Sequence, residues 1–384
     1  MGPAFEGSAM KLASFVLEEW LAKYRDSAAH HLGMSTGPKW TLAELEGLMT
    51  DAQREAFDGA ALTYCPSNGG EGLRAALAAM YGADAEEILV FNGGAEALLS
   101  LFAVVDEPKA NVVVPVPSFA PFYELPAALG IETRRYELKL EDGFALDVDA
   151  IVRLTDERTR LILVNTPHNP SGAVIGEDAI RELDAFAERR GIHLVVDEVY
   201  HPIYHGEPRR SAGEYSRATV LGDFSKSFSM PGLRIGWLLE RDAKRRRRLM
   251  NAHGWFTVST STLGELLAEV AARNRVTIFD RARAVSGANL RLLEEWARRH
   301  EDRLEWLRPE GSMTAFPRLR GERDARAFCI AAAERGVLLA PGDCFGAAAH
   351  FRIGFGVAMP RYGEALEILS DVLAEPRRRA RSAS

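Results

Sequence analysis

Three polar residues follow apolar runs at a nearly constant spacing, and this spacing constrains the fold more than any other feature of the chain. Asn169 lies 28 residues before Asp197, and Lys226 lies 29 residues after it. About 30 residues is the length of one strand–helix–strand unit. The spacing therefore predicts three consecutive parallel strands that bring these side chains to one C-terminal edge of a sheet, which is where open α/β sheets bind ligands.

Seven short β-branched runs alternate with helical patterns between residues 46 and 284. They cover residues 88–91, 112–115, 133–136, 161–164, 194–197, 219–222 and 235–238. This alternation predicts an α/β fold, with a seven-stranded, mostly parallel sheet in a large domain over residues 46–284. After residue 285, where a long helix is expected over 285–300, helices mix with short strands. We therefore expect a smaller α+β domain made of residues 1–45, with a helix over 10–24, and 285–384.

The bulk composition excludes several classes of protein. The chain has 384 residues and a net charge of −7, which argues against a nucleic-acid partner despite the basic runs at 244–248 and 377–381. Its three cysteines are widely spaced, which speaks against a structural zinc site and suits a reducing compartment. No apolar run is long enough for a membrane span, and residues 1–8 lack a secretory pattern. We expect a cytoplasmic protein with no metal and no membrane partner.

The residue types at the predicted sheet edge suit pyridoxal 5′-phosphate (PLP). Lys226 offers an amine for the cofactor's aldehyde, and Asp197 an acid for the pyridine nitrogen. Tyr200 and Asn169 can donate hydrogen bonds to the phenolate oxygen. Each residue alone has an ordinary structural explanation: a solvated lysine, a helix-capping aspartate or a packed tyrosine. Their combination at one edge favours a cofactor site.

A phosphate group would need its own binding site. Residues 91–98 run from a strand directly into a helix, and Gly93, Gly94 and Ala95 open that helix. Glycines let the backbone approach an anion closely, and a helix N-terminus offers free N–H groups. Arg234 would add a guanidinium and Ser225 a hydroxyl.

Two further residues are candidates for ligand contacts. Phe119 follows another predicted strand, where its ring could stack on the pyridine or simply pack in the core. Arg352 stands on an apolar strand of the smaller domain and would bind the carboxylate of an amino-acid substrate, unless it forms an internal ion pair.

The motifs that carry these residues resemble those of the class I/II aminotransferases, PLP-dependent enzymes of fold type I. They are Asn-Pro-x-Gly at 169–172, Asp-x-x-Tyr at 197–200 and Ser-Lys-(x)7-Arg at 225–234. The resemblance spans residues 64–356. It implies that Lys226 forms a Schiff base with PLP and moves the substrate's Cα proton. It also implies that Asp197, Asn169, Tyr200 and Arg234 bind the cofactor, and that Arg352, with Asn169, binds the substrate.

The same resemblance implies a homodimer with shared active sites. Tyr64 is similar to a tyrosine that reaches the phosphate of the neighbouring subunit in that family. Small-molecule amino acids and 2-keto acids are the implied substrates. The side chain of the substrate is expected to contact residues 31–40 and the loop around Trp255.

The chain departs from the family pattern in two places. Asp223 stands where the family has Ser or Thr to bind phosphate, and a carboxylate facing a phosphate would repel it. We expect Asp223 to turn away or to contact another group, so that Asp223→Ser does not weaken cofactor binding. The stretch 32–40 is also altered. Together with 312–317 and 341–345, it resembles the capreomycidine synthases, which use this fold to dehydrate and cyclise a hydroxyarginine.

These observations leave two enzymatic interpretations open. The first is an aminotransferase, and the second is a PLP-dependent elimination, replacement or cyclisation enzyme. A PLP-binding transcription regulator would need an added DNA-binding domain, and the 45 residues before the large domain are too few and not basic. A nicotinamide dehydrogenase is disfavoured because no G-x-G-x-x-G follows a strand.

Overall fold

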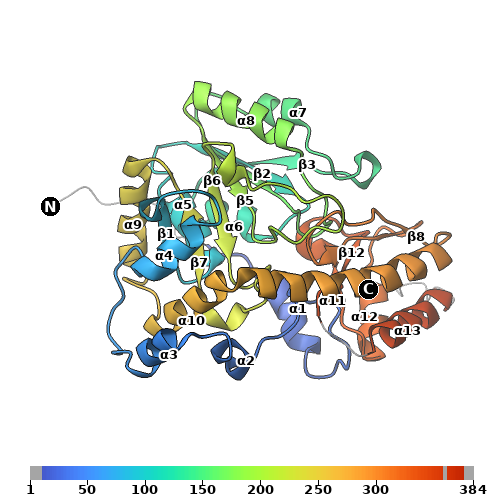
Figure 1. Cartoon of the computed structure of the whole chain (residues 1–384). Helices are drawn as coiled ribbons and strands as arrows, with labels where there is room; N and C mark the ends of the chain where they lie inside the picture. Colours follow the sequence, from blue (N-terminus) through green and yellow to red (C-terminus); the bar gives the residue numbers. More distant parts are fainter. Residues whose placement is uncertain (1–10, 358–360, 376–384) are drawn as a thin grey trace.

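A computed structural model describes residues 11–357 and 361–375, and its centre is a seven-stranded sheet (Figure 1). The strands lie in the order β1-β7-β6-β5-β4-β2-β3. The sheet is parallel from β3 to β6, and β7 runs antiparallel to both of its neighbours. The prediction of a seven-stranded, mostly parallel sheet is confirmed. The strands are β1 Ile88–Phe91, β2 Asn111–Val116, β3 Glu132–Glu137, β4 Thr159–Asn165, β5 His193–Asp197, β6 Thr219–Asp223 and β7 Gly236–Leu239.

Both faces of this sheet are covered over its inner strands, which explains why those strands are mostly apolar, whereas the edge strand β3 is polar and largely exposed. On β4, Leu161 and Leu163 pack into the cluster under α5, α6 and α9, whereas Ile162 and Val164 pack into the cluster on the opposite face. Helices α4, α8 and α10 contribute to that second cluster. These helices are α4 Glu71–Ala78, α5 Gly94–Ala103, α6 Pro121–Ala128, α8 Glu177–Arg190, α9 Ala243–Phe256 and α10 Thr262–Arg273.

The C-terminal part of the chain forms a second group of elements, joined to the first by the long helix α11 (Figure 1). Helix α11 spans Arg275–Arg299 and begins ten residues before the predicted start at 285, because Ile278, Phe279 and Ala282 continue its buried face. Beyond it lie a three-stranded sheet, β11-β12-β9, and a two-stranded sheet, β10-β8. These elements are β8 Leu304–Glu305, β9 Thr314–Ala315, β10 Arg318–Leu319, α12 Arg326–Glu334, β11 Ala340–Pro341, β12 Phe351–Gly354 and α13 Tyr362–Ala374.

The N-terminal segment packs against this C-terminal part. Helix α1 spans Val16–Tyr24, so it begins later than the helix expected over 10–24, and Trp20 on its buried face donates a hydrogen bond to the Leu339 carbonyl at 2.7 Å. The remaining helices are α2 Leu42–Glu46, α3 Asp51–Asp58 and α7 Val148–Arg153. The domain boundary predicted at 284 and 285 falls inside α11, and the two-domain division stays a prediction. The basic run at 377–381 and residues 1–8 lie outside the described residues.

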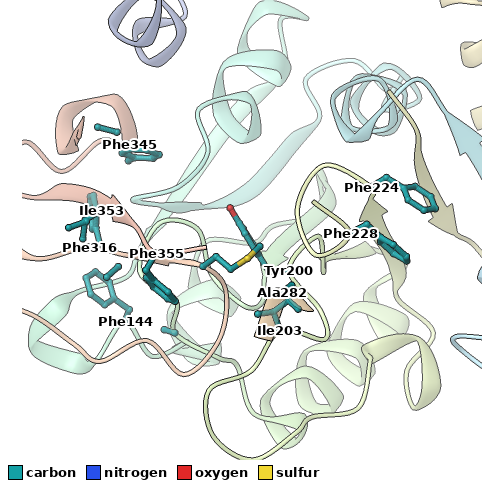
Figure 2. Close-up of a cluster of buried hydrophobic side chains, with 14 of the residues drawn as sticks. Phe144, Tyr200, Ile203, Phe224, Phe228, Ala282, Phe316, Phe345, Ile353 and Phe355 are labelled. Atoms are coloured by element: carbon teal, nitrogen blue, oxygen red, sulfur yellow. The ribbon is translucent and has the colours of Figure 1, made fainter. Parts of the chain in front are cut away.

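Tyr200 joins the two parts of the core (Figure 2). Its side chain is fully buried in a cluster that also holds Phe224 and Phe228 from the region of the large sheet and Phe355 from the C-terminal part. This continuous core fixes the edge of the large sheet relative to β12. Among the helices that the structure describes, none has the length and apolar character needed to cross a membrane.

Candidate active site

A cavity of about 320 Å³ opens at the C-terminal edge of β4, β5 and β6. The spacing of Asn169, Asp197 and Lys226 predicted this meeting point, and all three line the cavity. They lie at or just beyond the ends of three neighbouring strands, because β6, β5 and β4 are adjacent in the sheet. Most of the other predicted residues line it as well: Gly94, Ala95, Phe119, Ser225, Arg234 and Arg352.

Asp197 is the last residue of β5, and its carboxylate is buried in the floor of the cavity. The backbone N–H of Val199 donates to Oδ1 at 3.0 Å. Burial raises the pKa of Asp197 to about 7; the charge of Asp223 acts in the same direction and that of Lys226 in the opposite one. A buried carboxylate of this kind is stabilised by a cation, and a protonated pyridine nitrogen is such a group.

Lys226 and Tyr200 meet at one residue that the sequence interpretation did not single out, Ser35. The Lys226 amine donates to Ser35 Oγ at 2.9 Å, and the Tyr200 hydroxyl donates to the Ser35 carbonyl at 3.0 Å. Ser35 lies in the N-terminal segment, 191 residues from Lys226 in sequence. A backbone carbonyl and a hydroxyl thus hold the two side chains that would contact the cofactor's aldehyde and phenolate.

Arg352 on β12 is buried and reaches across to the large sheet. One terminal nitrogen donates to Asn169 Oδ1 at 3.1 Å, and the other donates to the Gly33 carbonyl at 2.7 Å. Its Nε has no hydrogen-bond partner among the described residues, and its guanidinium lies 4.7 Å from the centre of the Phe345 ring. Across the described part of the chain, no carboxylate forms an ion pair with Arg352, so the internal salt bridge considered from the sequence is not found there. A buried, unpaired cation favours an anionic ligand.

Asn169 is itself held by a second asparagine that the sequence interpretation missed. Asn165, at the end of β4, accepts a hydrogen bond from the Asn169 backbone N–H at 2.7 Å and donates to the Asp197 carbonyl at 3.0 Å. It therefore links the loops after β4 and β5. The signal that could have found Asn165 is its position at the end of an apolar run, where a buried amide needs partners.

The groups expected to bind an anion also meet in the structure. Gly93 has a left-handed φ of 84°, and a Cβ there would come within 2.5 Å of the Arg234 guanidinium. Arg234 Nη1 donates to the Pro231 carbonyl at 3.0 Å. Arg234 therefore lies against the glycine turn that opens α5, in the place where a guanidinium and helix N–H groups can act on one phosphate.

Asp223 lies in this anion site as well. The backbone N–H of Gly94 donates to its Oδ2 at 2.6 Å, and the backbone N–H of Ser225 donates to its Oδ1. Of the two behaviours expected from the sequence, Asp223 contacts other groups; it does not turn away, because it lines the cavity.

The three aromatic residues expected near the ligand lie in different places. Phe119 lines the cavity and meets Phe122 edge-on, with ring centres 5.9 Å apart. Tyr64 and Trp255 are 78% and 83% exposed and do not line the cavity of their own chain. The wall that the sequence interpretation did not foresee comes from α1 and the residue on either side of it: Phe15, Leu17, Glu18, Leu21 and Arg25.

The fold and this set of residues define a PLP-dependent enzyme of fold type I. The sequence matches the family of class I and II aminotransferases over residues 31–369, and the chain belongs to that family. It is 32% identical over 365 residues to the capreomycidine synthase of Streptomyces vinaceus, covering 93% of each protein.

Two solved structures are similar to the chain over nearly their whole length. A PLP-dependent aminotransferase from Streptococcus suis has a TM-score of 0.89 and 27% identity, covering 95% of this chain and 98% of that one. The PLP-dependent cyclase OrfR has a TM-score of 0.83 and 28% identity, covering 97% of this chain and 98% of that one.

The residues present fit PLP, the cofactor of the family. The glycine turn lets the backbone lie close to Arg234, Asp197 is a buried acid that forms no ion pair within the described residues, and the Lys226 amine opens onto the same cavity. The donor set therefore covers the phosphate, the ring nitrogen and the aldehyde, although Asp223 occupies part of the anion site.

We expect the buried Asp197 to make the cofactor-free protein less stable at high pH. An acid whose pKa is raised on folding binds its proton more tightly in the folded chain, so stability falls as pH rises from about 4 to about 7. Asp197→Asn removes this loss. The free energy of unfolding of the variant should therefore exceed that of the wild type by up to roughly 4 kcal/mol above pH 7, and by little near pH 4. Urea unfolding of both proteins across this range measures the difference. The exposed Asp302→Asn is the control, and parallel curves for Asp197→Asn and the wild type would contradict the assignment.

Ser35→Ala should slow the proton-transfer step without weakening cofactor binding. The substitution removes the hydroxyl that holds the Lys226 amine but keeps the carbonyl that accepts from Tyr200. Loss of the hydrogen bond that positions the amine predicts a roughly tenfold slower single-turnover rate and a larger Cα-deuterium isotope effect.

Ser229→Ala is the matched control, since the Ser229 hydroxyl contacts the Lys226 backbone carbonyl and not its amine. Equal rates for Ser35→Ala and the wild type, or a change in PLP affinity with no change in the isotope effect, would show that Ser35 does not position the amine.

Proposed function

We propose that the chain is an aminotransferase that moves an amino group between an α-amino acid and a 2-keto acid, with Lys226 as its catalytic amine. One observation carries the proposal: Arg352 is a buried guanidinium in the same cavity as Lys226, and no hydrogen-bond partner for its Nε is found in the part of the chain that the structure describes. An α-carboxylate is the anion that matches a planar guanidinium, and it places the amino group of an amino acid toward the lysine.

When bound, PLP supplies an aldehyde for amino groups and a cationic ring that accepts electrons from the substrate's Cα. Asp197 would hold the proton on the ring nitrogen, since a buried carboxylate stabilises a cation beside it. Asn169 would donate a hydrogen bond to the phenolate oxygen, and the Tyr200 hydroxyl would do the same by giving up its bond to the Ser35 carbonyl. Gly93, Gly94, Ala95, Ser225 and Arg234 would bind the phosphate, and Phe119 would cover one face of the ring.

Arg352 and Asn169 would orient the substrate together. They already contact each other at 3.1 Å, so a ligand bound to one of them lies next to the other. A bound carboxylate would satisfy the free Nε of Arg352 and leave the Cα–H bond turned toward Lys226. The Lys226 amine would then take the Cα proton, with Ser35 Oγ as its hydrogen-bond acceptor. A positioned amine with a nearby acceptor is suited to general acid–base catalysis.

A second candidate function is a PLP-dependent elimination, replacement or cyclisation reaction. It is favoured by the 32% identity to a capreomycidine synthase over 93% of the chain and by the likeness to the cyclase OrfR. The same residues serve it, because Lys226, Asp197 and Arg352 act at Cα and at the carboxylate in either reaction. The difference lies in whether a group leaves from the substrate's side chain.

The proposal includes a homodimer. Tyr64 is exposed and lies away from the cavity of its own chain, so a contact between Tyr64 and a phosphate requires a second subunit.

The proposed enzyme also has two domains. The large domain covers residues 46–284 and supplies Lys226, and the small domain covers 1–45 and 285–384 and supplies Arg352. Three free cysteines suit a cytoplasmic enzyme.

A half-reaction distinguishes the two candidate functions. The enzyme loaded with PLP is given one amino acid at a time, with no keto acid, and its absorbance spectrum is followed. An aminotransferase converts its cofactor stoichiometrically to the amine form and releases one keto acid per site. Continuous release of ammonia or water with no such conversion would support the second candidate and exclude transamination for that substrate.

Arg352→Gln should reduce kcat/KM for the best amino acid by about 100-fold or more, because it removes a charge-assisted bidentate contact. The amine that lacks only the α-carboxylate is the matched substrate control, and its slow reaction should change by less than about threefold. Single-turnover kinetics on both compounds give the comparison. An equal loss for the two would mean that Arg352 acts through the fold and not through the carboxylate.

A further inference from the structure

The carboxylate of Asp223 lies among the groups that are expected to bind the phosphate of PLP. Asp223 ends β6 and is only 6% exposed. Its two oxygens accept from the N–H of Gly94, at the start of α5, and from the N–H of Ser225. These are backbone donors at a helix N-terminus and in the turn before Lys226, the kind that binds a phosphate.

The remaining anion-binding groups lie around the same carboxylate. Arg234 lies against Gly93, and a Cβ on Gly94 would be 3.1 Å from Asp223 Oδ2. In the described residues, Asp223 forms no ion pair, and the Arg234 Nη1 donates to Pro231. The charge of Asp223 also reaches into the cavity, since it contributes to the raised pKa of Asp197. The carboxylate is therefore held by backbone N–H groups, and no ion pair with Arg234 neutralises it.

We propose that Asp223 is a built-in competitor for the phosphate of PLP. In the cofactor-free enzyme its carboxylate takes the Gly94 and Ser225 donors. A bound phosphate has to displace it or do without these donors. The phosphate therefore contributes less to PLP affinity than the site would otherwise allow, and cofactor binding is more readily reversed. This inference rests on PLP as the cofactor and is independent of which reaction the enzyme catalyses.

The test compares PLP with pyridoxal, which has the same ring and aldehyde but no phosphate. Dissociation constants for both are measured by spectroscopic titration of the full-length, cofactor-free wild type, Asp223→Ser and Asp223→Asn. Because both variants free at least one backbone donor and remove the repelling charge, we expect PLP to bind about 10- to 100-fold more tightly. Pyridoxal binding should change by less than about twofold.

Asp147→Asn is the matched control. Asp147 also accepts from a backbone N–H at a helix start, that of Ala150 at 2.9 Å, but it caps α7 and does not line the cavity. Neither dissociation constant should change in this variant. Asp223→Asn has nearly the shape of the wild type, so it gives a folded protein for the titration if the serine variant proves unstable.

Three results would overturn the proposal. Weaker PLP binding with unchanged pyridoxal binding would make Asp223 a phosphate ligand. Equal weakening of both compounds would assign it a purely structural role. Unchanged binding of both would show that the carboxylate does not compete. None of these results depends on substrate turnover, so they leave the aminotransferase proposal to its own half-reaction test.

Discussion

Three buried ionisable side chains govern the active-site cavity, and the fold keeps them from pairing with one another. Asp197, Asp223 and Arg352 are each buried, and within the described ranges none forms an ion pair. Backbone N–H groups stabilise the two acids, and a carbonyl and an amide oxygen stabilise the arginine. Since dipoles lower the free energy of a buried charge without cancelling it, each charge stays available to a ligand. The cavity is thus prepared for a cationic ring and an anionic carboxylate at different places.

The N-terminal segment holds this arrangement together. The Gly33 carbonyl accepts from Arg352, while Ser35 accepts from both Lys226 and Tyr200. The backbone of this segment packs closely against that of Leu339, as a Cβ on Gly33 would come within 3.1 Å of it. One short stretch therefore sets the distance between the lysine from the large sheet and the arginine from β12. A displacement of this stretch would move Lys226 and Arg352 together.

Much of this site could be predicted from the sequence because it depends on local regularities. The spacing of Asn169, Asp197 and Lys226 follows from the strand–helix–strand unit, and the seven runs correspond to seven observed strands. Ser35 and the α1 wall could not be predicted in the same way. Their contacts join residues nearly two hundred positions apart, and no periodicity encodes that packing. Asp223 lies between these cases: its residue type was unusual for its position, but its two backbone donors become visible only in three dimensions.

Two separate parts of the chain line the cavity, and this separation explains how the same fold can serve both aminotransferases and a cyclase. The cofactor-facing groups come from the loops after the large sheet's strands, whereas α1 supplies part of the opposite wall. That wall carries both signs of charge, since Glu18 and Arg25 lie 4.0 Å apart at its exposed rim. Removing the Cα proton places negative charge next to the substrate's side chain in either reaction. Whether a group then leaves depends on how that side chain is held. The reaction can therefore change through the residues of α1 and the N-terminal segment, while Lys226, Asp197 and Arg352 stay the same.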